Sequence, residues 1–352
     1  MVSSFGVSVW LLAVILSLSC QSVPLSNFSQ SRNEAPIIGV LAQPLDELVQ
    51  EPMAPKLTRS VDQYIESSHV KFLQSGGARV VPILFGLPQE FYFSLMGKLN
   101  GIYIPGGSTN LINPPHEPTA YMTWTSWLFD LAKEKNDKGI YFPVYGVCQG
   151  IQQLSIYRMK SPVMDTFKAV NVPMAFTVQP VEQKESRLFR GVSDRTFAHL
   201  EETIATTHLH TNGTLAERFY AEEGLQNFYN LLSVDQDLDG ATFINVIEGK
   251  HYPFYGVQFH PEMPPYAFGV FNVPHNEESI FLAQHFSKFF VDECRCNNQS
   301  FSDRLEELVY SIHNFPPTHI TWAEKPLWNE IHYFNSQQDY QSLLQKAEEV
   351  LQ

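Results

Sequence analysis

The segment YFPVYGVCQGIQQLSIYRM, residues 141–159, joins a predicted strand to a predicted helix through a turn that places Cys148 between two glycines. The apolar run at 141–148 predicts a buried strand. The residues that follow, 149–159, predict the start of a helix. A strand that runs directly into a helix is the building unit of an open, mostly parallel sheet.

The same unit recurs through the first half of the chain. Glycine and proline mark the ends of several segments, as turns and helix ends require. The repetition predicts an α/β fold with a doubly wound, mostly parallel central sheet, in which ligands bind at the carboxyl ends of the strands. The predicted strands lie at 36–44, 78–86 and 101–107, and the predicted helices at 60–77, 87–100 and 119–136.

The second half of the chain is less regular. Residues 165–250 alternate short apolar runs with polar turns, 255–262 predict a strand that ends in a polar cluster, and 279–296 predict a long helix. We expect one main domain at 36–315, followed by a C-terminal tail at 316–352 for which we predict no catalytic role. Two helical patterns, one before and one within this tail, flank a predicted linker.

The composition is that of a globular protein with an acidic surface. The 352 residues carry a formal net charge of −14, and hydrophobic residues make up 44% of them. So acidic a chain is a poor match for nucleic acid or for an anionic membrane surface. The twelve histidines would gain positive charge below about pH 6. The acidity would therefore be partly offset in an acidic compartment.

The N-terminus predicts a secretory signal peptide at 1–19, followed by a flexible polar leader at 20–35. The apolar stretch at 7–18 is shorter than the roughly 20 residues that a membrane-spanning helix needs. An uncleaved anchor is the alternative. Sequons of the N-x-S/T type predict a glycosylated protein of the secretory route. They begin at Asn27, Asn212 and Asn298.

The cysteines do not suggest a disulfide scaffold. If Cys20 leaves with the signal peptide, three cysteines remain, and an odd number cannot be fully paired within one chain. Cys294 and Cys296 are too close in sequence to bridge each other easily. We therefore expect a free thiol.

Cys148 has the setting of a catalytic nucleophile. A sharp turn between strand and helix holds a side chain out of the packing, and the positive end of the following helix favours a thiolate. Gly146 and Gly150 relieve crowding at such a turn. The alternative is a small buried hydrophobe, because free cysteines are among the most buried residues.

A cysteine nucleophile needs a base, and the base needs a group that orients it. The segment FHPE, residues 259–262, supplies both at the end of a predicted strand. His260 could act as the base and Glu262 could orient its imidazole. A single histidine among twelve is usually a core or surface residue, so the conjunction with Cys148 is what favours catalysis.

A bare backbone turn, PGGS at 105–108, ends a neighbouring predicted strand. An N–H group of Gly106 or Gly107, together with that of Gln149, could bind a developing oxyanion. Taken alone, the motif is more often an ordinary glycine turn.

These motifs together resemble the class I glutamine amidotransferase-like superfamily, which shares PGG, GVCQGIQ and VQFHPE in this order. Within it, three longer segments resemble the γ-glutamyl hydrolase family: YIESSHVKFLQSGGARVVP (64–82), YFPVYGVCQG (141–150) and YPFYGVQFHPEMPPY (252–266). The resemblance runs from about residue 36 to about residue 315.

The resemblance implies a flavodoxin-like three-layer sandwich with a mostly parallel sheet. It implies a homodimeric glycoprotein of the lysosome or the extracellular space, with no membrane association once the signal peptide is gone. The implied reaction is cleavage of γ-glutamyl bonds in polyglutamylated folates and antifolates through a thioester on Cys148, without a metal or cofactor.

The resemblance also implies substrate-binding residues. His208 falls where the family has a substrate-site histidine, although His210 competes for that place, and Gln258 matches a position that lines the same site. The family usually has an acidic residue four positions after the nucleophile, where this chain has Gln152. We expect Gln152 to contact substrate, as in amidotransferases.

Two other functions stay open from the sequence. A glutaminase subunit of an amidotransferase would use the same triad on free glutamine, but it would work with a synthetase, and the predicted signal peptide argues against that setting. A catalytically inactive binding protein of the same fold would be expected to lack a triad member, and all three are present.

Overall fold

The computed structural model describes residues 32–45, 60–160, 162–179, 185–319 and 330–351. The predicted signal peptide, most of the predicted leader and the sequon at Asn27 lie outside these residues.

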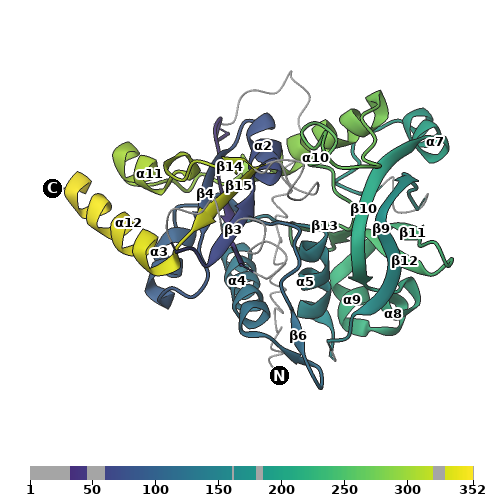
Figure 1. Ribbon diagram of the computed structural model, residues 1–352, viewed down its shortest axis with the longest axis horizontal. Helices are drawn as coiled ribbons and strands as arrows, with labels where there is room; N and C mark the ends of the chain where they lie inside the picture. The colour runs from purple at the N-terminus through teal and green to yellow at the C-terminus, as the bar shows by residue number, and fades with distance from the viewer. Residues whose placement is uncertain (1–31, 46–59, 161, 180–184, 320–329, 352) are drawn as a thin grey trace, which may run out of the picture.

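A seven-stranded sheet forms the centre of the molecule (Figure 1). Five neighbouring strands are parallel, and two antiparallel strands extend one edge, so the predicted mostly parallel sheet is confirmed. The strands that carry the predicted site motifs, β5, β8 and β13, are adjacent and fully buried. In sheet order the strands are β11 (Tyr229–Gln236), β12 (Thr242–Gly249), β13 (Phe254–Val257), β8 (Val144–Val147), β5 (Gly101–Ile104), β1 (Ile37–Leu41) and β4 (Arg79–Ile83).

Helices cover both faces of this sheet, which confirms the predicted three-layer sandwich (Figure 1). Helices α2 (Ser67–Ser75) and α10 (Glu277–Cys294) contact each other on one face. Helices α4 (Ala120–Asp137) and α5 (Gln149–Arg158) pair on the other. Strands that are buried between two helical layers can be apolar along their whole length, which explains their continuous hydrophobic sequence.

Smaller elements surround the sandwich. One four-stranded sheet has the order β14 (Thr318–His319), β15 (Glu330–Phe334), β3 (Gln63–Glu66) and β2 (Gln43–Pro44). Strands β9 (Asp165–Ala175) and β10 (Ile204–Gly213) form an antiparallel ribbon, and β6 (Ile112–Asn113) pairs with β7 (Glu117–Pro118). The other helices are α3 (Gln89–Met96), α7 (Asp194–Glu202), α8 (Ala216–Ala221), α9 (Glu223–Phe228), α11 (Arg304–Tyr310), η1 (Ile312–Asn314) and α12 (Ser336–Leu351).

The predicted helix at 60–77 is wrong in its first part. Residues Gln63–Glu66 form β3, and the helix begins only at Ser67. Strand β3 pairs with β15, which lies more than 250 residues later in the chain. The apolar spacing of Val61 and Ile65 is compatible with a helix, but the distant strand provides backbone partners that local periodicity cannot reveal.

Both ends of the described chain are tied to the sandwich. Arg32 and Asn33 belong to the last part of the predicted leader. Arg32 donates a hydrogen bond to the main-chain oxygen of Asp292, and the N–H of Asn33 donates to that of Arg295, both at the end of α10. The tail contributes β15 to the four-stranded sheet, and α11 and α12 confirm the two predicted helical patterns.

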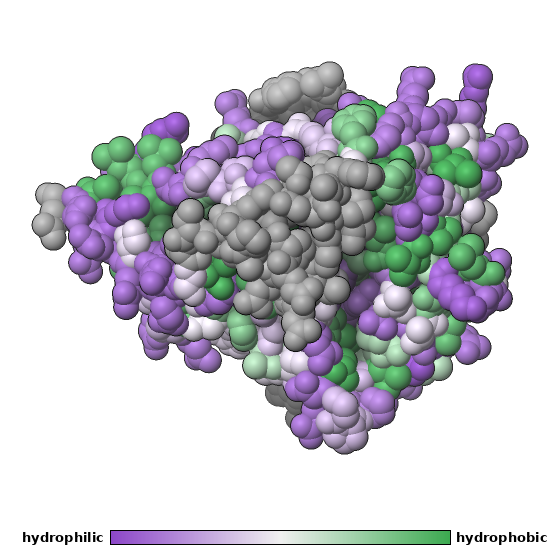
Figure 2. Space-filling view, in the orientation of Figure 1, coloured by the Kyte–Doolittle hydropathy of each residue, from purple (hydrophilic) through white to green (hydrophobic). Residues whose placement is uncertain are grey.

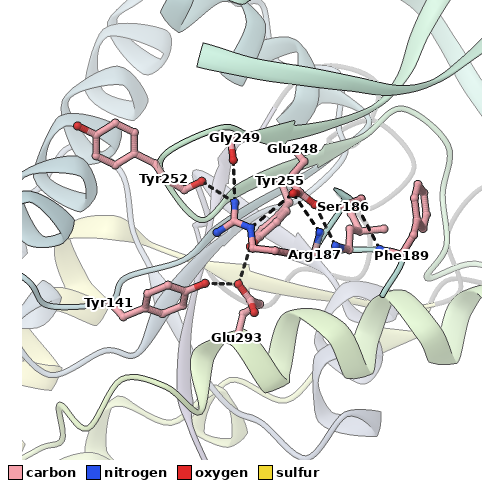
Figure 3. Close-up of polar contacts among 10 residues, drawn as sticks. Tyr141, Ser186, Arg187, Phe189, Glu248, Gly249, Tyr252, Tyr255 and Glu293 are labelled. Carbon is pink, nitrogen blue, oxygen red and sulfur yellow. Dashed lines mark hydrogen bonds and ion pairs between the residues drawn. The ribbon is translucent and has the colours of Figure 1, made fainter. Parts of the chain in front are cut away.

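A buried polar cluster lies at the amino end of β13, and we call it the Arg187 cluster: Arg187, Glu248, Glu293, Tyr141 and Tyr255 (Figure 3). The guanidinium donates to the Glu248 carboxylate at 3.4 Å and lies over the Tyr255 ring, 5.2 Å from its centroid. Glu293 Oε2 accepts hydrogen bonds from the hydroxyl groups of Tyr141 and Tyr255. The cluster joins α10, β12 and β13 at the end of the sheet away from the predicted site.

The surface shows apolar side chains gathered over α11 (Figure 2). Leu305 is 56% exposed and Leu308 is 49% exposed. Within the described residues, no helix combines the length and the apolar character that crossing a bilayer requires.

Candidate active site

The three predicted motifs meet at one edge of the sheet. Cys148 directly follows β8, Gly106 follows β5, and His260 follows β13. Because β8 pairs in parallel with both β5 and β13, the carboxyl ends of the three strands lie side by side. This is the edge at which open α/β sheets bind ligands.

Cys148 occupies a strained turn. Its φ is 51° and its ψ is −102°, a positive-φ conformation that non-glycine residues rarely adopt. A Cβ on Gly146 would lie 2.5 Å from the carbonyl carbon of Gly150, and a Cβ on Gly150 would lie 2.5 Å from the oxygen of Ile104. Both glycines are therefore required for the turn to close against β5, as the sequence predicted.

His260 and Glu262 are joined as predicted. The imidazole Nδ1 lies 2.7 Å from Glu262 Oε1, and both side chains are buried. Burial acts to lower the pKa of His260, but the charges of Glu262 and Cys148 outweigh it and hold that pKa well above its usual value. The other nitrogen, Nε2, has no partner of normal hydrogen-bond geometry within the described residues. The ring therefore has one nitrogen fixed and one free toward the thiol side.

Glu262 remains an anion although it is completely buried. Burial alone would raise the pKa of its carboxyl group, but His69 and His260 reverse that effect and leave the pKa below its usual value. A buried carboxylate is tolerated only when donors surround it. Glu262 thus serves as a fixed negative charge behind the imidazole.

The turn after β5 fits the predicted oxyanion site. A Cβ on Gly106 would lie 2.8 Å from His260 Cε1 and 3.2 Å from Cys148 Cβ, so this backbone passes directly beside both side chains. Within the described residues, the N–H groups of Gly106, Gly107 and Gln149 donate no backbone hydrogen bond. Free N–H groups beside a nucleophile are what an oxyanion hole requires.

Gln43 stabilises this turn through hydrogen bonds. It lies outside the motifs identified in the sequence. Its side-chain amide donates to the carbonyl groups of Pro105 at 3.2 Å and Gly106 at 2.9 Å. The Tyr64 hydroxyl donates to Gln43 Oε1 at 3.0 Å. Gln149 adds a further tie, because its side chain donates to the carbonyl of Thr109.

The predicted substrate residues His208 and Gln258 lie beside the triad. The N–H of His260 donates to the carbonyl of Thr207, the residue before His208 on β10. Burial, with the charge of His260, lowers the pKa of His208 to about 3, so its ring is neutral, and His208 Nδ1 and Gln258 Nε2 have no partner within the described residues. Unpartnered buried polar atoms next to a nucleophile are candidates for substrate contact.

Gln152 and His210 converge on one carbonyl. Gln152 Nε2 donates to the oxygen of Asn212 at 2.7 Å, and His210 Nδ1 lies 3.0 Å from the same oxygen. Both side chains are buried, and His210 Nε2 is left without a partner in the described part of the chain. The rings of His208 and His210 are neighbours, with centroids 5.5 Å apart, so either histidine can serve as the predicted substrate-site histidine.

Two further residues lie behind the triad. His69 on α2 approaches Glu262 with its Nε2 at 3.7 Å from Oε1. Glu66 ends β3, and burial together with the charge of Glu262 raises its pKa from 4.5 to about 8. Both lie in the segment 64–82 that carries part of the family resemblance, where the expected helix obscured them.

Other predicted features can be placed on the structure. The asparagines of the sequons at Asn212 and Asn298 are exposed, although Thr214 of the first sequon is buried. Cys148 and Cys294 are free thiols, which confirms that Cys294 does not bridge to Cys296. In the described ranges, no group of three or more His, Cys, Asp and Glu side chains is arranged to hold a metal ion.

Comparison with known proteins gives a consistent result. The family model described as Peptidase C26 matches residues 36–262, more than half of the chain. A gamma-glutamyl hydrolase of Rattus norvegicus is 32% identical over 310 residues, covering 87% of this chain and 92% of the relative. The gamma-glutamyl hydrolase of Homo sapiens is 32% identical over 312 residues, covering 87% and 93%. Gamma-glutamyl hydrolase B of Dictyostelium discoideum is 30% identical over 310 residues, covering 86% and 84%. The chain is therefore a hydrolase that belongs to the peptidase C26 family.

Proposed function

We propose that this hydrolase cleaves γ-glutamyl bonds with Cys148 as the nucleophile. The observation that carries the proposal is the meeting of Cys148, His260 and the Gly106 turn at three adjacent strand ends. The names of its relatives support the choice of bond. The strained turn, the buried imidazole–carboxylate pair and the free N–H groups supply the parts of a thiol acyl-transfer site.

The first half of the reaction forms a thioester. His260 takes the proton of the Cys148 thiol, and the sulfur attacks the carbonyl carbon of the γ-glutamyl amide. The carbonyl oxygen gains negative charge and is stabilised by the N–H groups of Gly106, Gly107 and Gln149. The tetrahedral intermediate then collapses as His260 returns its proton to the leaving amine.

The second half releases the acyl group. A water molecule gives a proton to His260 and attacks the thioester carbonyl, which regenerates the oxyanion at the same N–H groups. Collapse expels the Cys148 sulfur, which recovers its proton, and frees the γ-carboxylate. Glu262 stabilises the imidazolium in both halves, because its negative charge lies 2.7 Å from Nδ1.

Polyglutamylated folates and antifolates are the proposed substrates, as the γ-glutamyl hydrolase resemblance implies. His208 or His210, Gln258 and Gln152 are the proposed substrate-binding residues. For the two histidines and Gln258 the support is a buried nitrogen without a partner among the described residues, and for Gln152 it is the hydrogen bond to the Asn212 carbonyl that His210 also contacts. Neutral donors of this kind can bind the polar groups of a glutamyl chain.

We also propose a secreted or lysosomal glycoprotein that forms a homodimer. The exposed side chains of Asn212 and Asn298 support glycosylation. The apolar surface over α11, with Leu305 and Leu308, is a candidate contact between two copies. Light scattering of the wild type and of Leu305→Glu would show whether this surface holds a dimer together.

The deciding experiment is product analysis with pteroyl-pentaglutamate at acidic pH. Wild type is expected to shorten the glutamyl chain, and Cys148→Ala is expected to leave it intact. A parallel incubation with free glutamine tests the amidotransferase alternative. Ammonia release from glutamine without cleavage of the pentaglutamate would overturn the proposal, and inactivity on both would favour a binding protein.

A further inference from the structure

We propose that His69 is a positioning residue of this reaction, whose Nε2–H holds the Glu262 carboxylate in place behind His260. The inference rests on the proposed function, because it concerns the same triad. It adds a fourth member to the chain of contacts, on a different element. Residues that orient metal-binding side chains from behind change activity by about 10–100-fold when they are altered, and we expect a residue that orients a triad carboxylate to act on the same scale.

The geometry gives His69 two polar neighbours. The ring is completely buried on α2, with Nδ1 2.8 Å from the Tyr103 hydroxyl and Nε2 3.7 Å from Glu262 Oε1. Tyr103 lies on β5, so His69 connects the helical layer, the sheet and the triad. The imidazole has no other hydrogen bond within the described part of the chain.

The contacts fix the tautomer of His69. Burial and the charge of Glu262 raise the pKa of Tyr103 well above its usual value, so the phenol keeps its proton. That proton is donated to His69 Nδ1, since the opposite arrangement would leave a buried O–H without an acceptor and would aim a nitrogen lone pair at the Glu262 carboxylate. The second ring proton therefore resides on Nε2 and points toward Glu262.

This contact is a dipole acting on a charge. Burial lowers the pKa of His69 to about 4, with Glu262 opposing and His260 adding to that effect, so the ring is neutral above this pH. At 3.7 Å the N–H is too distant for a strong hydrogen bond, yet in a buried setting it still stabilises the anion. Glu262 Oε1 thus has two N–H groups directed at it, while Oε2 has no partner among the described residues.

Other groups that face Glu262 do not supply a competing charge at acidic pH. Glu66 is protonated below about pH 8. Tyr103 and Tyr145 keep their hydroxyl protons, because burial and the charge of Glu262 raise the pKa of both. The titratable groups around Glu262 are His260, His69, Glu66, Tyr103 and Tyr145. Without the Nε2–H of His69, the Glu262 carboxylate would be protonated at a higher pH, and the triad would lose its orienting anion there.

Two substitutions of His69 distinguish the contact made by Nε2 from the contact made by Nδ1. The side-chain amide introduced by His69→Gln can place an N–H where Nε2 was, whereas the shorter amide of His69→Asn reaches only the Nδ1 side near Tyr103. We expect His69→Asn to lower kcat for pteroyl-pentaglutamate about tenfold with KM unchanged. We also expect the acid limb of its pH profile to move upward by about one unit. His69→Gln should keep kcat within about threefold and leave the limb in place.

The inference is overturned if His69→Asn and His69→Gln show the same kinetics. Equal losses that follow their thermal stability would assign His69 a packing role, and wild-type kinetics in both would assign it none. If His69→Asn does not fold, Tyr103→Phe takes its place, because losing the phenol frees the tautomer and should move the same limb in the same direction. The wild type and Cys148→Ala are measured first, so a failure of γ-glutamyl hydrolysis itself is seen separately.

Discussion

The two ends of β13 carry two different kinds of buried charge. At the amino end, the Arg187 cluster has a partner for each of its buried nitrogen and oxygen atoms within the described residues. At the carboxyl end, each of three neighbouring side chains has one atom without a hydrogen-bond partner in the described part of the chain: His260 Nε2, Glu262 Oε2 and His69 Nε2. Glu248, Glu293 and Tyr255 are as buried as the three side chains of the carboxyl end, while the Arg187 side chain is 19% exposed, so burial alone does not account for the difference.

The two clusters differ in whether their buried polar atoms have hydrogen-bond partners. A fully paired network stabilises the join between sheet and helix, and removing one member leaves an uncompensated charge. An unpaired donor or acceptor in the interior costs free energy, and beside a reacting group it is a position that a bound ligand can complete. Changes at the carboxyl end should therefore affect rate more than stability, and changes at the amino end the reverse.

The largest effect is expected for His260→Asn. Loss of the base and of the proton donor should reduce kcat/KM for pteroyl-pentaglutamate by about 10⁴-fold or more. Thermal stability should fall as well, because the ring contacts the buried Glu262 carboxylate at 2.7 Å, but by less free energy than the loss of rate represents. The control is His285→Gln, which alters a partly buried histidine whose Nε2 lies 2.8 Å from the Leu188 carbonyl oxygen. Comparable rate losses in the two variants would contradict the assignment of His260 as the base.

Arg187→Met should show the opposite pattern. Removing the guanidinium leaves the buried Glu248 carboxylate without its cation and should lower the free energy of unfolding by about 3 kcal/mol, while the folded enzyme keeps its kcat. Urea unfolding and steady-state kinetics on the same preparation measure both quantities. Lys133→Met removes a partly exposed pair with Asp137 and should change stability by less than about 1 kcal/mol. A drop in kcat for Arg187→Met would mean that the two ends of β13 are coupled.

Gly106→Ala should give an intermediate effect on rate. The added methyl group would lie 2.8 Å from His260 Cε1, so the imidazole or the turn must shift, and kcat should fall about 10–100-fold. Gly97→Ala is the control, because its Cβ would meet only the Ser94 and Phe93 carbonyl oxygens, at 3.2 Å and 3.6 Å. Wild-type kcat in Gly106→Ala would show that the turn does not contact the reacting atoms.

Local patterns predicted the turn at Cys148 because the residues that this turn requires are close together in the sequence. Gly146, Cys148 and Gly150 lie within five residues, and a sharp strand–helix turn requires small neighbours. His260 and Glu262 were predicted to form a pair for the same reason, since proline holds them two residues apart at a strand end. The family resemblance then joined the two segments, which composition and spacing alone could not do.

The rest of the site depends on contacts between distant parts of the sequence. Gln43 reaches Gly106 across more than 60 residues, and His69 reaches Glu262 across more than 190. Gln43 belongs to no motif, and His69 lies in a segment of the family resemblance whose local pattern predicted only a helix. Strand β3 was missed for a related reason, because its partner β15 comes near the end of the chain.

The smallest effect should appear in the pH dependence of stability. The pKa of Glu66 is raised to about 8 by burial and by Glu262, so the folded protein holds this proton more tightly than the unfolded chain does. The resulting stability is complete below the unfolded value near 4.5 and is lost as the pH rises through about 8. Wild type should therefore lose more thermal stability between pH 5 and pH 8 than Glu66→Gln, by a few degrees in Tm. The buried neutral histidines, which destabilise the fold as the pH falls, are common to both proteins and cancel in this difference. Parallel curves for the two proteins would show that Glu66 is already ionised in the folded state, and that the region behind the triad carries a second negative charge.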